Sequence, residues 1–282
     1  MTDPKWARET DQGRYYLDPQ GGPDLVSVTN VLSTGVAKHA ITPWAVKLTA
    51  EYCVDNRMTI ARRALRDRAE LLKDIKRVHR DARESAADLG TRIHHRAHMM
   101  ALGAPYPPDP EVDPYARQLA RWWESWGVDL DQHIEAAEMT FLHRTLGYAG
   151  TGDCLIWLPT GPGGVLELWL IDYKTSAKRP AKQVFPEQAM QLAALRYAES
   201  VLLPDDSEMA VPAVARTGIL NLRRRSRALV PMPGDRRAWR AFRGALETTK
   251  WMHGSTGATY EVLTPPPAES RPMAGAGVGR AA

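Results

Sequence analysis

Apolar residues recur at helical spacing through the first half of the chain. Residues 58–100 contain no proline, and their apolar positions follow one another at intervals of three or four, as on one face of a helix. One or two long helices are expected there. Further helices are expected at residues 43–52, where Pro43 suits the first turn, and at residues 115–126. Ser27 or Thr29 can cap a short helix before them.

From residue 131 the pattern changes to short apolar runs separated by glycine and proline, which is typical of strands joined by turns. These runs predict a sheet core with flanking helices at residues 131–251, after a mainly helical portion at 27–130. Residues 1–264 would form one domain, and the Pro/Ala/Gly-rich residues 265–282 a disordered tail. The expected strands are residues 135–143, 152–158, 165–173 and 213–222, and the expected helices are residues 185–201 and 236–251.

Composition narrows the class of protein only slightly. The 282 residues carry a net charge of +4, which is compatible with a nucleic-acid partner but does not require one. The two cysteines, Cys53 and Cys154, form no Cys-x-x-Cys pair, which excludes a cysteine-only zinc or iron–sulfur site and favours a reducing compartment. No apolar run reaches transmembrane length and the N-terminus lacks a signal-peptide pattern, so we expect a cytoplasmic protein with no membrane partner.

Three charged residues in the predicted sheet suggest chemistry. Asp172 and Lys174 end an almost continuous apolar run and, two apart on a strand, would project from the same face. Asp153 follows Gly-Thr-Gly on the neighbouring strand of a predicted hairpin. Two buried carboxylates repel each other unless a cation lies between them. We therefore predict a Mg²⁺ or Mn²⁺ site held by both aspartates and the carbonyl of Tyr173, with Lys174 orienting water or neutralising a phosphate.

Other polar residues are weaker candidates on spacing alone. Either His94 or His95 could supply an imidazole ligand, but adjacent helical residues face different directions, so only one would enter the site. Glu138 begins the first core strand, either as an exposed charge or as a residue supporting the ligands. Gln191 lies on a predicted helix and could hydrogen-bond a phosphate or a water, with Tyr197 about a third of a turn round that helix.

Taken in order, these residues resemble the motifs of the PD-(D/E)XK nuclease superfamily, in particular RecB-type nuclease domains and the related exonucleases of CRISPR adaptation and bacteriophages. The likeness covers roughly residues 80–200. The matching segments are Gly90-Thr-x-x-His94, Glu138, Gly150-Thr-Gly-Asp153, Asp172-Tyr-Lys174-Thr and Gln191-Leu-x-x-Leu-x-Tyr197.

The resemblance implies an α/β fold with a mixed central sheet flanked by helices, which is a restriction-endonuclease-like core, and an N-terminal helical portion. It implies that His94, Asp153 and Asp172 ligate metal and that Lys174 is the catalytic lysine. Gln191, with Tyr197, would line the site. The expected activity is hydrolysis of DNA phosphodiester bonds, as an exonuclease in phage or bacterial recombination and repair, alongside proteins such as a helicase or an annealing protein. The chain departs from several relatives because it lacks their four iron–sulfur cysteines.

Two alternatives remain at this stage. The basic cluster Arg223-Arg-Arg-Ser-Arg227 and the Arg/Lys-rich residues 62–83 would suit a non-catalytic module that binds nucleic acid or supports an assembly, although such charge runs are more often solvated faces. The glycine-rich residues 147–152 could suggest a nucleotide-binding enzyme. They do not match Gly-x-Gly-x-x-Gly and do not open a helix, so this interpretation is the weakest.

Overall fold

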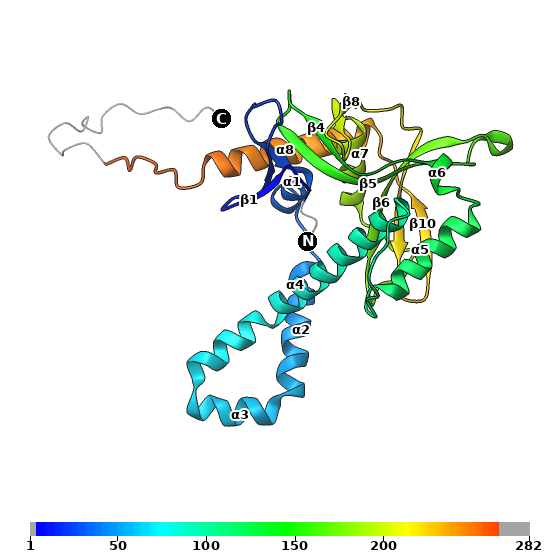
Figure 1. Ribbon diagram of the computed structural model, residues 1–282. Helices are drawn as coiled ribbons and strands as arrows, with labels where there is room; N and C mark the ends of the chain where they lie inside the picture. The colour runs from blue at the N-terminus through cyan, green and yellow to red at the C-terminus, as the bar shows by residue number, and fades with distance from the viewer. Residues whose placement is uncertain (1–3, 265–282) are drawn as a thin grey trace, which may run out of the picture.

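A ten-stranded mixed sheet with helices on both faces organises the protein (Figure 1). The structure is a computed structural model that describes residues 4–264; the expected tail, residues 265–282, lies outside the described residues. The strands are β1 (Ala7–Thr10), β2 (Gly13–Tyr16), β3 (Leu25–Ser27), β4 (Ile134–His143), β5 (Tyr148–Leu158), β6 (Glu167–Thr175), β7 (Ser200–Leu202), β8 (Glu208–Ala210), β9 (Arg216–Leu222) and β10 (Arg227–Pro231). The α-helices are α1 (Val28–Thr34), α2 (Ile41–Asp55), α3 (Arg57–Arg66), α4 (Arg68–Ala101), α5 (Asp113–Ser125), α6 (Leu130–His133), α7 (Pro186–Arg196) and α8 (Arg236–Gly254).

Strand β5 is the centre of the sheet. It pairs with β4 in antiparallel orientation along most of its length, with β3 in parallel at its first residues, and with β6 in antiparallel orientation along its second half. Strand β6 then pairs with β9 in parallel, and β9 pairs with β10 in antiparallel orientation. The expected mixed α/β architecture is confirmed.

Both faces of the sheet are covered by apolar packing. On one face, buried residues of α1, α7 and α8, including Val31, Leu192 and Phe242, pack against the strands. On the other face, α4 and α5 contribute a second cluster, in which Ile93 and Leu119 are buried. The sheet therefore lies between two apolar layers of helices.

Helices α2, α3 and the first half of α4 form an arm that projects from the sheet (Figure 1). No residue of α2 or α3 is buried, and apolar side chains such as Val54, Met58 and Leu65 remain exposed on them. The expected one or two helices at 58–100 are present as α3 and α4. Only the second half of α4 reaches the sheet, and it brings one helix face to the candidate site.

Several elements differ from the sequence-based expectation in their bounds, and some of the strands were not expected. The helix expected over 185–201 ends at Arg196, because Val201 and Leu202 pair with β4 as the short strand β7. Strand β5 begins at Tyr148 rather than near residue 152, so the glycine-rich segment is strand. A Cβ on Gly152 would lie 2.5 Å from the ring of Phe141, which explains glycine at this close approach. Strand β10 was not expected, and the basic cluster forms the turn before it.

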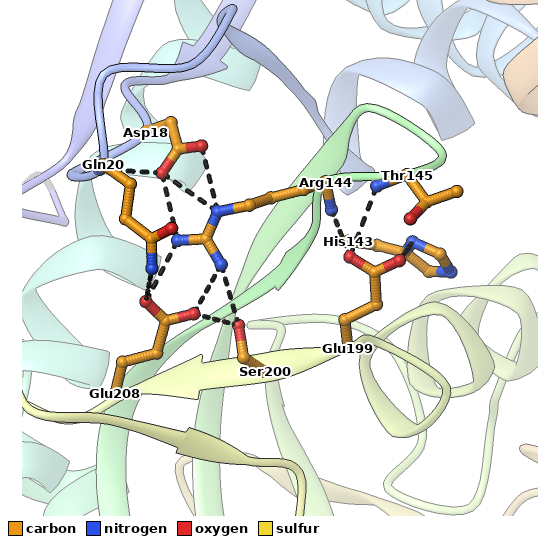
Figure 2. Close-up of polar contacts among 8 residues, drawn as sticks. All are labelled: Asp18, Gln20, His143, Arg144, Thr145, Glu199, Ser200 and Glu208. Carbon is orange, nitrogen blue, oxygen red and sulfur yellow. Dashed lines mark hydrogen bonds and ion pairs between the residues drawn. The ribbon is translucent and has the colours of Figure 1, made fainter.

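An arginine clamp fixes the turn between β4 and β5 (Figure 2). The guanidinium of Arg144 donates to both carboxylate oxygens of Asp18, with Nε–Oδ2 at 2.9 Å and Nη2–Oδ1 at 3.0 Å. It also forms an ion pair with Glu208 of β8. Planar guanidinium–carboxylate pairs of this kind are specific in geometry, so the clamp ties the β4–β5 turn to the loop before β3 and to the sheet edge.

Replacing Gly35 with alanine is expected to lower the free energy of unfolding by about 1–3 kcal/mol, the usual effect of overpacking. A Cβ at this residue, which follows α1, would lie within 2.8 Å of the Cα of Ala245 in α8. Gly244→Ala is the matched control, since its Cβ would meet nothing within 4 Å and alanine favours a helix interior by about 1 kcal/mol. Urea denaturation of both variants measures this difference, and equal stability of the two would contradict the packing described for α1 and α8.

Candidate metal centre

Strand alternation brings the predicted aspartates and lysine together. The register that pairs Cys154 with Ile171 sets Asp153 of β5 directly across from Asp172 of β6. Lys174 lies on the same face as Asp172, and both line one cavity. Cys154, Ile171 and Tyr173 point to the opposite face, where they are buried beneath α4 and α5. On both strands, the buried apolar face thus holds the opposite, polar face in position.

Helix α4 contributes one histidine to this cavity. His94 Nδ1 lies 3.0 Å from Asp153 Oδ1, whereas His95 is exposed on the next face of the helix. Gly90, one turn earlier, lines the same cavity, and the nearest atom to a Cβ placed there would be Thr175 Oγ1 at 3.6 Å. Burial opposes charging of His94, but the carboxylate of Asp153 outweighs it and raises the pKa of His94 to about 9.

Strand β4 contributes Glu138 through an unusual backbone conformation. Its φ is +54°, a left-handed value that is costly for a residue with a side chain, on the order of 1–3 kcal/mol. The pairs Ala137–Cys154 and Met139–Gly152 on either side set Glu138 across from Asp153. Burial, and then the negative charge of Asp153, raise the pKa of Glu138 to about 8. The strained backbone and the burial of an acidic group both cost stability. Residues with these two features cluster at functional sites.

The side chain of Asp172 is held by two partners. Gln191 of α7 donates from Nε2 to Asp172 Oδ1 at 2.6 Å, and Lys174 Nζ lies 2.5 Å from Oδ2. Burial raises the pKa of Asp172 despite the opposing effect of Lys174. For Lys174, burial favours the neutral amine, but the attraction of Asp172 and Asp153 prevails and raises its pKa. The lysine therefore remains an ammonium group at neutral pH.

Asp153 has the opposite electrostatic balance. Burial would raise its pKa, but His94, Lys174 and the backbone N–H of Tyr173 together lower it. That N–H donates to Asp153 Oδ2 at 2.5 Å. Asp153 is therefore ionised and fixed in place by two directional contacts.

Three of these residues could hold a metal ion together. One ligand atom each from His94, Glu138 and Asp153 lie within 4.8 Å of one another. Asp172, predicted as a ligand, is not in this group; its oxygens contact Lys174 and Gln191. Glu138, whose role the sequence left open between an exposed charge and a residue near the metal, is in the group. Imidazole and carboxylate donors suit Mn²⁺, and the carboxylates suit Mg²⁺, so the residues fit the predicted cations.

The cavity around this cluster has a volume of about 480 Å³ and is open to solvent on one side. It also contains Arg14 and Gly150. A second, smaller cavity of about 320 Å³ adjoins it and shares Thr29, Lys174 and Gln191 with it. The second cavity is mainly basic and polar, with Lys38, Arg179 and Arg223 in its lining and Glu187 as the carboxylate there.

Two predicted residues lie apart from this cluster. The ring of Tyr197 packs 5.4 Å from that of Trp239 on α8, and the guanidinium of Arg236 lies over it. Leu195, four residues after Gln191 and on the same helix face, lines the cavity instead. The side chain of Tyr173 is buried on the opposite face, and the role of its carbonyl as a metal ligand stays a prediction.

If this cavity catalyses a metal-dependent reaction, replacing Gln191 with alanine is expected to slow that reaction by about 10–100-fold, because Asp172 would no longer be fixed beside Lys174 and a small misplacement of a positioned group has an effect of this size. Asp172 would lose the hydrogen bond to Oδ1 and could rotate toward Lys174. Gln118→Ala, on α5 and outside this cavity, controls for loss of a buried amide. Initial rates with saturating Mn²⁺ measure the effect, and wild-type rates for Gln191→Ala would remove this residue from the site.

Comparisons with known proteins leave the function open. No protein-family model matches the chain, and no curated protein matches it. Among the solved structures that match, the crystal structure of SSO0001 is similar over 80% of this chain and 75% of its own, with 14% sequence identity and a TM-score of 0.31. Between residues 4 and 264, the helices lack the combination of length and apolar character that crossing a membrane requires.

Proposed function

We propose that the protein is a Mg²⁺- or Mn²⁺-dependent deoxyribonuclease of the PD-(D/E)XK type. The observation that carries this proposal is the convergence of His94, Glu138 and Asp153 within 4.8 Å, beside the Asp172–Lys174 ion pair. Two carboxylates and an imidazole can hold a divalent cation, and the Lys174 ammonium lies beside them. Phosphodiester hydrolysis needs such positive charge, because the negative charge of the substrate must be neutralised before a nucleophile can attack it.

Each side chain has a distinct task in this reaction. His94, Glu138 and Asp153 would hold the divalent cation, which when bound polarises the phosphate and lowers the pKa of a water. Lys174, an ammonium because its pKa is raised, would stabilise charge on the phosphate oxygens rather than act as a base. Asp172 would orient Lys174 through the ion pair, and Gln191 would fix Asp172.

Exonuclease action on linear DNA in recombination or repair, in the cytoplasm and beside a helicase or an annealing protein, is part of the proposal. It is supported by the family resemblance of the motifs. A non-catalytic nucleic-acid-binding module is the competing function, supported by the basic β9–β10 turn. Two features favour catalysis over binding alone. The acidic cluster would repel DNA in a module that only binds it, and the backbone strain at Glu138 is a cost that is typical of active sites.

The test is hydrolysis of DNA labelled at the 5′ or 3′ end, supplied as linear and as circular molecules, with Mg²⁺ or Mn²⁺. Wild-type protein is expected to shorten linear DNA progressively from its ends, and Lys174→Ala to be at least about 100-fold slower. Lys178→Ala, an exposed lysine beyond the end of β6, is the matched control. Equal rates for wild type and Lys174→Ala would overturn the proposal, and cleavage of circular DNA would replace exonuclease by endonuclease action.

A further inference from the structure

The basic cluster at residues 223–227 is divided by the fold into an inner and an outer part. Arg223 is buried, and its guanidinium donates to the carbonyls of Lys174 and Arg179 at 2.9 and 2.7 Å. Arg224 and Arg225 are exposed at the tip of the β9–β10 turn. Arg227 reaches back to α5, where it donates to Gln118 Oε1 at 3.2 Å and to the carbonyl of Arg121 at 3.0 Å.

This turn begins where the strand carrying the lysine ends. Strand β9 runs parallel to β6, with Asn221 beside Lys174 and Leu222 beside Thr175. Arg225 is four residues beyond Asn221, so at about 3.3 Å per extended residue it lies within about 13 Å of the row that contains Lys174. One DNA strand advances about 3.4 Å per nucleotide. The turn therefore lies within about four nucleotides of the proposed cleavage point.

The positive charge along this path is not neutralised within the protein. Arg92, Arg144 and Arg216 form ion pairs with carboxylates, whereas other arginines of the described residues, such as Arg57 and Arg240, do not. Over residues 4–264, none of the five arginines of the path has a carboxylate partner; they are Arg121, Arg223, Arg224, Arg225 and Arg227, and we term them the arginine ridge.

The outer end of the arginine ridge is a cleft of about 470 Å³ between α5 and the turn. Arg121, Arg225 and Arg227 line it together with Trp122 and Trp126, and no acidic residue does. The rings of the two tryptophans lie 6.1 Å apart, and Trp126 is partly exposed. Cationic side chains beside an accessible aromatic ring are the combination that binds a nucleic-acid backbone and stacks on its bases.

We propose that the arginine ridge is a second DNA-binding surface, along which the phosphates of the strand flanking the cleaved bond run from the metal centre to the cleft on α5. This inference rests on the proposed function, since it takes the strand in the metal centre to be DNA. Arg223 contributes charge from below the surface, and Arg121, Arg224 and Arg225 contact phosphates directly. The occupant is a phosphodiester chain because the cleft combines arginines with a partly exposed tryptophan and has no acidic residue in its lining.

Binding measured without divalent metal, in EDTA, tests the arginine ridge separately from hydrolysis. The test variant is Arg121→Ala/Arg224→Ala/Arg225→Ala, whose three side chains are exposed. The control variant, Arg57→Ala/Arg237→Ala/Arg240→Ala, removes the same charge from exposed arginines on α3 and α8. Fluorescence anisotropy with labelled 30-base-pair DNA gives log Kd against log salt. The slope is expected to fall in magnitude by about 2–3 for the test variant, about 0.9 for each lost phosphate contact, and to stay near the wild-type value for the control.

Substrate length provides a second readout. The test variant is expected to match the affinity of wild type on DNA that extends fewer than about four nucleotides from the cleavage point toward the ridge, and to bind longer DNA more weakly than wild type does.

Equal melting temperatures confirm that both variants fold. If the test and control variants have equal slopes of log Kd against log salt and equal affinities at every DNA length, the arginine ridge does not bind DNA, even if the protein hydrolyses DNA. If wild type hydrolyses no DNA but the slope still falls, the proposed nuclease function fails while the ridge stands. Tighter capture of an acidic peptide than of DNA by the ridge would also overturn the inference.

Discussion

Replacing Asp153 with asparagine is expected to slow metal-dependent DNA hydrolysis by about three orders of magnitude, which corresponds to about 4 kcal/mol of transition-state stabilisation. Asp153 joins the parts of the site, since it contacts His94 at 3.0 Å and accepts the N–H of Tyr173 at 2.5 Å. Asparagine preserves the shape but removes the charge that a divalent cation requires. Initial rates over a range of Mn²⁺ concentrations separate loss of metal affinity from loss of turnover.

The same substitution also tests the metal-free protein. Against the effect of burial, the pKa of Asp153 is lowered by His94, Lys174 and the N–H of Tyr173, so its charge stabilises the folded state at neutral pH despite the nearby carboxylates Glu138 and Asp172. Asp153→Asn should therefore lower the melting temperature of the metal-free protein, because His94 loses its ionised partner, and should also remove the increase that Mn²⁺ gives to wild type. Asp113→Asn, which breaks the ion pair with Arg96 outside the cavity, is the matched control. Mn²⁺ stabilisation that survives in Asp153→Asn would place the ion elsewhere.

The residues that the sequence could identify are those whose position depends only on strand periodicity. Asp172 and Lys174 share a face because they are two apart on β6, and this followed from the apolar run that contains them. The pairing of Asp153 with Asp172 needed only an antiparallel hairpin between the two strands. Periodicity is local, so it can be read from neighbouring residues.

The role of Glu138 depends on information that is not local. Its side chain reaches the ligand group because the backbone takes a left-handed conformation in the middle of β4, which no nearby glycine or turn motif announces. The choice between His94 and His95 depended likewise on the rotation of α4 against the sheet. On α7, the leucine that shares a face with Gln191 lines the cavity, whereas Tyr197 packs on Trp239. Periodicity favoured Leu195 there, and the family motif favoured the tyrosine.

The two short strands beyond β4 could not be predicted from the sequence either. Strands β7 and β8 have three residues each, and their conformation comes from pairing with β4 and with each other. Val201 continues the apolar pattern of α7, so the prediction from sequence extended the helix to this residue. The partner strand, distant in sequence, decided the outcome.

The metal-free protein is expected to lose stability as the pH rises from about 5 to 8, because Glu138 is easier to keep protonated in the folded state. Its pKa rises from an ordinary value of 4.5 to about 8 on folding. Between these values the folded protein holds a proton that the unfolded chain has released, so the free energy of unfolding falls by at most about 1.4 kcal/mol per pH unit. The contribution is complete below pH 4.5 and lost above about 8. His94, whose pKa rises to about 9, acts in the same direction from pH 6.5 upward.

Metal binding should have the opposite pH dependence, because the ion replaces these protons. Each proton released on binding makes the Kd for Mn²⁺ tenfold tighter per pH unit, up to about pH 8 for Glu138. Glu138→Gln cannot release that proton, so its Mn²⁺ affinity should be weaker and the slope of log Kd against pH smaller by one. Calorimetric titration in two buffers of different protonation enthalpy counts the protons directly. Glu135→Gln, an exposed glutamate near the start of β4, is the control. An unchanged proton count in Glu138→Gln would mean that the strained residue does not bind the ion, and that its cost to the metal-free fold has another cause.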